Sequence, residues 1–111
     1  MFKKSERPNR TKFAEYFKIG RRFHSDNFTA IYYPAPMRAV AVVVGKKVHK
    51  GAVERNTLRR RVYAALRAVF ESEAVATGIY IIICKPAAKN LERSAVLPEV
   101  ASLLATISKP R

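Results

Sequence analysis

The feature that most constrains this chain is a long helical pattern with one apolar face. Between Ala52 and Ser72, apolar residues recur at the i, i+4, i+7, i+8 and i+11 spacing that brings side chains onto one side of an α-helix. This spacing predicts a helix whose apolar side packs in the core. The predicted core positions are Leu58, Val62, Ala65, Leu66 and Val69.

The opposite side of the same helix carries cations with hardly any acids between them. Residues 46–67 contain eight Lys and Arg side chains and one acid, Glu54. Solvated helix faces usually interleave both signs, whereas crowded guanidinium groups repel one another and match phosphate oxygens, so the pattern favours a nucleic-acid interface. Lysines precede the helix, where free backbone N–H groups attract anions. The predicted exposed stripe is Asn56, Arg59, Arg60, Tyr63 and Arg67, with Arg55 and Arg61 at its margins and Lys46, Lys47 and Lys50 before it.

Charge and apolar content together indicate a compact protein that binds a polyanion. The 111 residues include 22 Lys and Arg against 8 Asp and Glu, a net charge of +14, and 49% of them are hydrophobic. This apolar content is too high for a disordered basic tail, and the length suffices for one hydrophobic core. The sequence therefore predicts a single domain over residues 1–111.

Other residue types exclude several classes of protein. One cysteine, Cys84, cannot form an internal disulfide, and with only His24 and His49 beside it no protein-built zinc site is expected. Both observations predict a cytoplasmic protein. The longest apolar runs have six residues, against about 20 in a membrane-spanning helix, so no membrane span is expected. Residues 1–8 have charge but no apolar stretch behind them, so a secretory signal is not expected either. Because both histidines lie among cations, we predict no catalytic residue and no metal site in the protein itself.

Hydrophobic periodicity predicts the remaining elements. The last helix should begin between Ser94 and Pro98, since Pro98 is tolerated only in a first turn, and its core positions are Val96, Val100, Leu103, Leu104 and Ile107. Strands at 27–33 and 38–45 follow one another closely and are predicted to pair antiparallel. The complete set is a helix over 10–18, strands over 27–33, 38–45 and 79–85, the long helix over 52–72 and this last helix.

A second cluster combines aromatic and basic residues near the N-terminus. Phe13 and Phe17 share one side of the first predicted helix, with Lys12 beside them. Aromatic rings among cations are typical of single-stranded nucleic-acid binding, but the same spacing also suits two core residues, and both interpretations stay open. Tyr32 and Tyr33 are adjacent in a strand, so they should point to opposite sides of the sheet.

The order of these motifs resembles the protein component of bacterial ribonuclease P. That family has a phenylalanine pair before a Lys-x-Gly turn, an aromatic strand, a valine strand running into Lys-Lys, and Arg-Asn-Arg-x-Lys-Arg-x-x-Arg opening a helix. The matching segments are residues 13–20, 28–33, 42–47 and 55–60, and the similarity in order and spacing covers about residues 7–107. Linked motifs are far more specific than any single one.

The resemblance implies an α+β, single RNA-binding domain, ordered over about residues 7–107. The implied order is α-β-β-β-α-β-α with a four-stranded sheet, a short first strand near residues 21–24 and a left-handed β-α-β crossover. The implied function is to bind the catalytic RNA of ribonuclease P and the 5′ leader of precursor tRNA, which that RNA removes. The chemistry then belongs to Mg²⁺ held mainly by the RNA. Neither a membrane nor an obligate protein partner is expected.

Carried onto this sequence, the resemblance assigns two groups of binding residues. The group for the catalytic RNA is Lys46, Lys47, Lys50, Arg55, Asn56, Arg59, Arg60, Arg61 and Arg67. The group for the leader, which also rests on the phenylalanine pair and on strand alternation, is Lys12, Phe13, Phe17, Ile31 and Tyr33.

The chain departs from the family pattern at four positions. Thr57 and Tyr63 replace motif arginines, and Arg61 stands where the family tends to be apolar. Ile31 stands where the family often places a leader-contacting aromatic, with Tyr33 on the same strand face as a substitute. The helix therefore keeps its charge but distributes it differently.

Two further classes of function remain as alternatives. One is a ribosomal-type or RNA-chaperone protein, which would use the same basic helix without any role in cleavage. The other is a DNA-binding helix, ranked lowest because Asn56 is the single base-reading side chain of the stripe and helix-turn-helix spacing is lacking. Reconstitution with a bacterial ribonuclease P RNA at low magnesium separates these classes.

Overall fold

The order of helices and strands confirms the order that the family resemblance implies, including the short first strand. The computed structural model describes residues 10–72 and 75–108, so residues 7–9 of the expected ordered core lie outside it. A short 3₁₀-helix after the last strand was not predicted. The elements are α1 (Arg10–Ile19), β1 (Arg21–His24), β2 (Phe28–Pro34), β3 (Ala39–Val43), α2 (Ala52–Ser72), β4 (Gly78–Cys84), η2 (Pro86–Asn90) and α3 (Arg93–Ser108).

The sheet contains one pairing that differs from the prediction. Its strand order is β1-β2-β4-β3, with β2 antiparallel to both β1 and β4, and β3 parallel to β4. The predicted antiparallel pair of β2 and β3 is therefore wrong, because β4 lies between them. All residues of β4 except Ile83 are buried, and a strand so uniformly apolar is stabilised by a central position. The long helix α2 consequently connects two parallel neighbours, β3 and β4.

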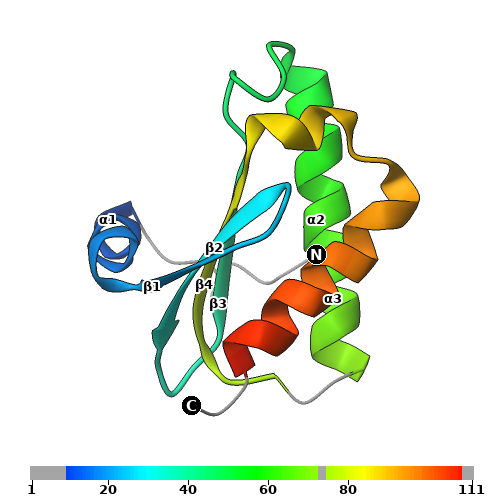
Figure 1. The fold of residues 1–111 in the computed structure, drawn as a ribbon. Helices are drawn as coiled ribbons and strands as arrows, with labels where there is room; N and C mark the ends of the chain where they lie inside the picture. The colour runs from blue at the N-terminus through cyan, green and yellow to red at the C-terminus, as the bar shows by residue number, and fades with distance from the viewer. Residues whose placement is uncertain (1–9, 73–74, 109–111) are drawn as a thin grey trace.

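The helices cover the two sides of the sheet unequally. Figure 1 shows α2 and α3 together on one side, and α1 is the one helix of the described residues on the other. On the first side, all ten predicted core residues of α2 and α3 are buried, together with Phe28, Tyr32 and Tyr80 from the strands. On the second side, a small cluster of Ile31, Ala39, Ile79 and Ile81 lies between the sheet and α1. Tyr32 and Tyr33 face opposite sides, as predicted.

The helix α1 approaches the sheet closely where Gly20 ends it. A Cβ atom at Gly20 would lie 2.8 Å from the carbonyl oxygen of Tyr16 and would also meet the side chain of Ile31. The Gly20 N–H donates to the same Tyr16 oxygen at 2.9 Å. Absence of a side chain at this position thus permits the helix to turn into β1 directly above β2.

The last helix begins earlier than predicted. Its first residue is Arg93, so Pro98 lies in the second turn instead of the first. The Ala95 N–H donates to the Glu92 carbonyl at 3.0 Å, which adds a tight turn at the start of α3. Periodicity located the buried side of α3 correctly, but it could not predict this extra turn.

A carboxylate connects α3 to the turn between β1 and β2. Glu99 accepts hydrogen bonds from the Ser25 hydroxyl at 2.5 Å, from the Asn27 backbone N–H at 2.8 Å and from the Asn27 amide at 2.7 Å. Burial raises the pKa of Glu99, but the hydrogen bonds and the charge of Lys85 outweigh it, so the pKa lies below its usual value. Lys85 also donates to the Ser25 carbonyl at 2.7 Å.

Candidate nucleic-acid interface

The predicted lysine cluster lies on a well-anchored loop that leads into α2. The carbonyl oxygen of Gly45 accepts hydrogen bonds from the backbone N–H groups of Val48 and His49, at 3.1 and 3.4 Å. The side chain of Val48 is 3% exposed and packs in the main core, whereas Lys46, Lys47 and Lys50 are exposed. The loop therefore presents its cations to solvent from a fixed backbone.

A lysine that the sequence did not predict joins this cluster. Lys89 on η2 lines the same hollow, of about 810 Å³, as Lys46, Lys47 and Lys50. In Figure 1 the loop before α2 and η2 lie near one another at the N-terminal end of α2. No sequence signal connects Lys89 to the loop, because they are far apart in the chain and meet only through the packing of β4 beside β3.

The arginines of α2 divide into exposed and structural groups. Arg60 and Arg67 are exposed on the predicted stripe, and so is Asn56, whose side-chain oxygen accepts a hydrogen bond from half-buried Arg59 at 2.5 Å. Arg55 is half-buried and makes hydrogen bonds within the protein. Its guanidinium donates to the carbonyl oxygens of His49 and Lys50, at 3.1 and 2.6 Å, and so holds the lysine loop against the helix.

Three other residues of α2, Arg61, Thr57 and Tyr63, make contacts within the protein. Arg61 lies toward η2 and α3, where it lines hollows with Ala88 and with Val96. Thr57 donates from its hydroxyl to the Val53 carbonyl at 2.9 Å. Tyr63 is half-buried, and its hydroxyl oxygen accepts a hydrogen bond from the Val42 N–H of edge strand β3 at 3.2 Å.

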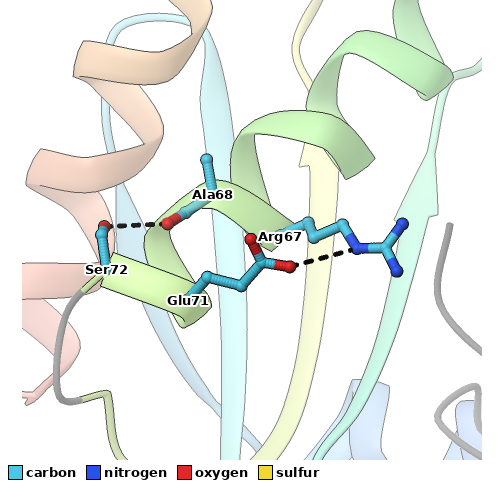
Figure 2. A network of polar contacts seen from close by, with 4 residues as sticks. All are labelled: Arg67, Ala68, Glu71 and Ser72. Atoms are coloured by element: carbon cyan, nitrogen blue, oxygen red, sulfur yellow. Dashed lines mark hydrogen bonds and ion pairs between the residues drawn. The ribbon is translucent and has the colours of Figure 1, made fainter.

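Acidic side chains moderate the charge of α2 at both of its ends. Figure 2 shows Arg67 and Glu71 paired at the C-terminal end, with 3.5 Å between Nε and Oε1, and Ser72 donating to the Ala68 carbonyl nearby. The pair is weak because both side chains are more than half exposed. At the other end, the Glu54 carboxylate lies against Gly51 in the first turn. Between them, residues 55–67 contain five arginines and no acid.

Aromatic residues form a second exposed cluster on the α1 side of the sheet. Phe17 is 36% exposed, and the guanidinium of Arg22 lies 4.9 Å from the centre of its ring and donates to the Phe17 carbonyl at 3.2 Å. Tyr33 is half-buried, with its ring 5.2 Å from that of Tyr16, a residue that sequence reasoning did not assign to this face. Ile31 is 1% exposed, so it lies buried beneath this face, in the cluster against which Tyr33 packs. The predicted side chains of Lys12 and Phe13 lie outside the described residues.

The two histidines and the cysteine, the other residues considered for catalysis or metal binding, lie at separate places in the structure. His24, whose Nδ1 lies 3.1 Å from the Thr29 hydroxyl, lines a hollow beside α3, whereas His49 lines hollows beside α2. Burial raises the pKa of the Cys84 thiol to about 12, so the thiol stays neutral. Within residues 10–72 and 75–108, no three His, Cys, Asp or Glu side chains are grouped so that they could hold a metal ion. Among the described helices, none is long and apolar enough to cross a membrane.

Fold and surface together define a class of small α+β proteins. In this chain, the helix that connects two parallel strands of a mixed sheet presents cations and follows a lysine-bearing loop. The chain belongs to the ribonuclease P protein family, since the family model described as Ribonuclease P matches residues 2–108.

Individual relatives agree with this assignment. The ribonuclease P protein component of Parasynechococcus marenigrum is 32% identical, over 85% of this chain and 85% of its own. That of Microcystis aeruginosa is also 32% identical, over 86% and 84%. Among solved structures, the RNase P protein from Thermotoga maritima superposes with a TM-score of 0.81 at 22% identity, over 94% of this chain and 99% of that one. A Staphylococcus aureus RNase P protein mutant gives 0.83 at 18%, over 94% and 89%.

Proposed function

We propose that this protein is the RNA-binding subunit of ribonuclease P and helps the catalytic RNA to remove the 5′ leader from precursor tRNA in the cytoplasm. The observation that carries the proposal is the convergence of cations at the N-terminal end of α2. Lysines from the loop and from η2 line one hollow there, and the exposed Arg60 and Arg67 follow further along the same helix. Phosphates are the natural partner of such a surface, because they relieve its self-repulsion.

In this proposal the two sides of the sheet bind different RNAs. The loop and α2 bind the catalytic RNA through Lys46, Lys47, Lys50, Asn56, Arg59, Arg60 and Arg67, with Lys89 added, Arg61 at the margin and Arg55 positioning the loop. The α1 side binds the single-stranded leader. Phe17 and Tyr33 supply aromatic surface for its bases, and Ile31 is buried in the cluster against which Tyr33 packs. Lys12 and Phe13 are assigned to the same binding group from the sequence.

Magnesium chemistry belongs to the RNA in this account. The proposed interface is built from cations and contains no carboxylate cluster among its described residues, so its donor set does not suit Mg²⁺. The protein's own contribution is to neutralise phosphates and to position the substrate. No protein side chain is assigned a proton-transfer step.

Reconstitution tests this function directly. A bacterial ribonuclease P RNA is assayed for precursor-tRNA cleavage at low magnesium, with and without the protein. We expect cleavage only with both components, since the protein replaces the charge screening that high magnesium otherwise supplies. Binding without any restored cleavage would favour a ribosomal-type or chaperone role instead.

Variants of the interface test how the protein binds. Arg60→Ala should weaken binding to the catalytic RNA and reduce the log–log salt slope by about 0.7–0.9, the value for one lost phosphate contact. Lys18→Ala on α1 is the matched control, because it removes one exposed charge from the other side of the sheet. If Arg59→Ala and Arg60→Ala left both affinity and slope unchanged, the proposed interface would be wrong.

A further inference from the structure

The basic stripe of α2 contains a small hollow with mainly apolar walls. Arg60, Tyr63, Ala64 and Arg67 line it, and its volume is about 240 Å³. The ring of Tyr63 and the methyl group of Ala64 provide apolar surface. Arg60 lies one helical turn before Tyr63 on α2, and Arg67 lies one turn after it. Every other position of the stripe presents a polar or charged side chain, so this hollow is chemically distinct from its surroundings.

The tyrosine ring in this hollow is held in a fixed orientation. Its hydroxyl oxygen accepts a hydrogen bond from the Val42 N–H at 3.2 Å. Val42 belongs to β3, an edge strand, so the bond anchors the tip of the ring to the edge of the sheet. The ring also packs against the main core. A ring that is already immobilised loses little conformational entropy when a ligand stacks on it.

Arg60 and Arg67, on the two sides of the Tyr63 ring, suit the phosphates next to a base stacked on that ring. Arg60 is exposed, and Arg67 has a 53% exposed side chain whose pair with Glu71, at 3.5 Å, is weak enough to be exchanged for a phosphate. A flat π surface with a guanidinium on either side matches a nucleotide, since the base stacks and the adjoining phosphates bind the cations.

We propose that this hollow binds one unpaired nucleobase of the catalytic RNA, with Tyr63 as the stacking residue and Arg60 and Arg67 on the flanking phosphates. The inference rests on the proposed function, because it assigns a base contact within the same interface. It gives α2 two kinds of contact with RNA, phosphate pairing along the stripe and stacking at one position.

Substitutions at Tyr63 separate stacking from charge. Tyr63→Leu should weaken binding to a bacterial ribonuclease P RNA at least about 5-fold, the lower limit for loss of one stacked base, without changing the salt slope, because no charge is lost. Tyr63→Phe should bind within about 2-fold of the original protein, because the ring is kept and its packing against the main core still orients it after the bond to Val42 is lost. Phe70→Leu is the matched control, since Phe70 is a half-buried aromatic of the same helix that contacts Tyr80 with a ring separation of 5.4 Å. It should lower the melting temperature and leave RNA affinity unchanged.

Cross-linking tests the same contact in the unaltered protein, so it does not depend on whether Tyr63→Leu folds. RNA containing 4-thiouridine is irradiated in the complex, and the protein is cleaved with trypsin. We expect a cross-link in the peptide of residues 62–67, in which Tyr63 is the one aromatic residue. Absence of that peptide from the cross-links, or original affinity of a folded Tyr63→Leu protein, would overturn the inference. If Arg59→Ala still weakened binding, the proposed function would stand without it; if Arg59→Ala and Arg60→Ala also had no effect, the proposed function would fail as well.

Discussion

The two sides of the sheet differ in how completely they are covered. Among the described residues, the side beneath α2 and α3 has 21 buried residues in one cluster, whereas the side beneath α1 has four. The same central strand, β4, contributes to both. On the first side α2 is supported along its length and directs its cations outward. On the second side Phe17 and Tyr33 keep part of their surface, because α1, the one helix on that side among the described residues, has ten residues and does not cover all four strands.

This difference teaches how one small domain can have two binding surfaces. A rigid helix backed by a large core suits phosphate contacts, which depend on the fixed spacing of charges. A partly covered aromatic surface suits single-stranded nucleic acid, which supplies its own flat bases. The proposed division of roles between the catalytic RNA and the leader follows from this difference in packing.

The largest expected effect compares two neighbouring isoleucines of β4. Ile82 is 1% exposed on the α2 side, and Ile81 is fully buried on the α1 side. We expect Ile82→Ala to lower the free energy of unfolding by about 3–5 kcal/mol and Ile81→Ala by about 2–3 kcal/mol, because α1 can settle into the space left on its side. Urea denaturation measures both. Equal losses would show that the α1 side is packed as rigidly as the other.

An intermediate effect concerns the bond network that connects α3 to the β1–β2 turn. Because the folded pKa of Glu99 lies below the usual value of 4.5, its stabilisation is complete above that pH and is lost as pH falls through the folded pKa. Glu99→Gln should therefore cost about 1–2 kcal/mol at pH 7, from weakened charged hydrogen bonds, and progressively less below about pH 5. Glu71→Gln, in an exposed pair, is the control and should change stability by less than about 0.5 kcal/mol. A pH-independent loss for Glu99→Gln would contradict this assignment.

The smallest expected effect concerns the two histidines, which line separate hollows, His24 beside α3 and His49 in the lysine loop. Replacing His24 and His49 together by Gln should leave precursor-tRNA cleavage by the reconstituted enzyme within a few-fold at saturating protein. A side chain that transfers a proton in the reaction normally contributes about 10²–10⁴-fold. A loss of that size with assembly intact would place acid–base chemistry in the protein.

Local periodicity predicted most of the elements, whereas pairing across the sheet was less accessible. The buried positions of α2 and α3 follow from the 3.6-residue repeat, which depends only on nearby residues. The position of β4 between β2 and β3 depends on contacts between distant segments, and sequence proximity favoured the wrong pair. The left-handedness of the crossover through α2 stays a prediction.

In the candidate site, too, features set by local sequence were predictable, whereas contacts between distant segments were not. The exposure of Arg60 and Arg67 was predictable from the helix pattern, but the inward bonds of Arg55 were not, because the pattern does not locate the loop carbonyls that accept them. Lys89 joins the lysine hollow only through tertiary structure. Tyr63 was identified as a departure from the family motif, yet its bond to the sheet edge required knowledge that β3 is an edge strand.

The central claim, that the two sides of the sheet serve different RNAs, is tested most directly by the affinity of the reconstituted enzyme for precursor and mature tRNA. Phe17→Ala should weaken binding of precursor tRNA by about 5- to 150-fold, the value of one stacked base, and leave binding of mature tRNA, which lacks the leader, unchanged. Ile19→Ala, which removes a 52% exposed apolar side chain from the same helix, is the control and should alter neither. An equal loss for both ligands after Phe17→Ala, or no loss for either, would contradict the claim.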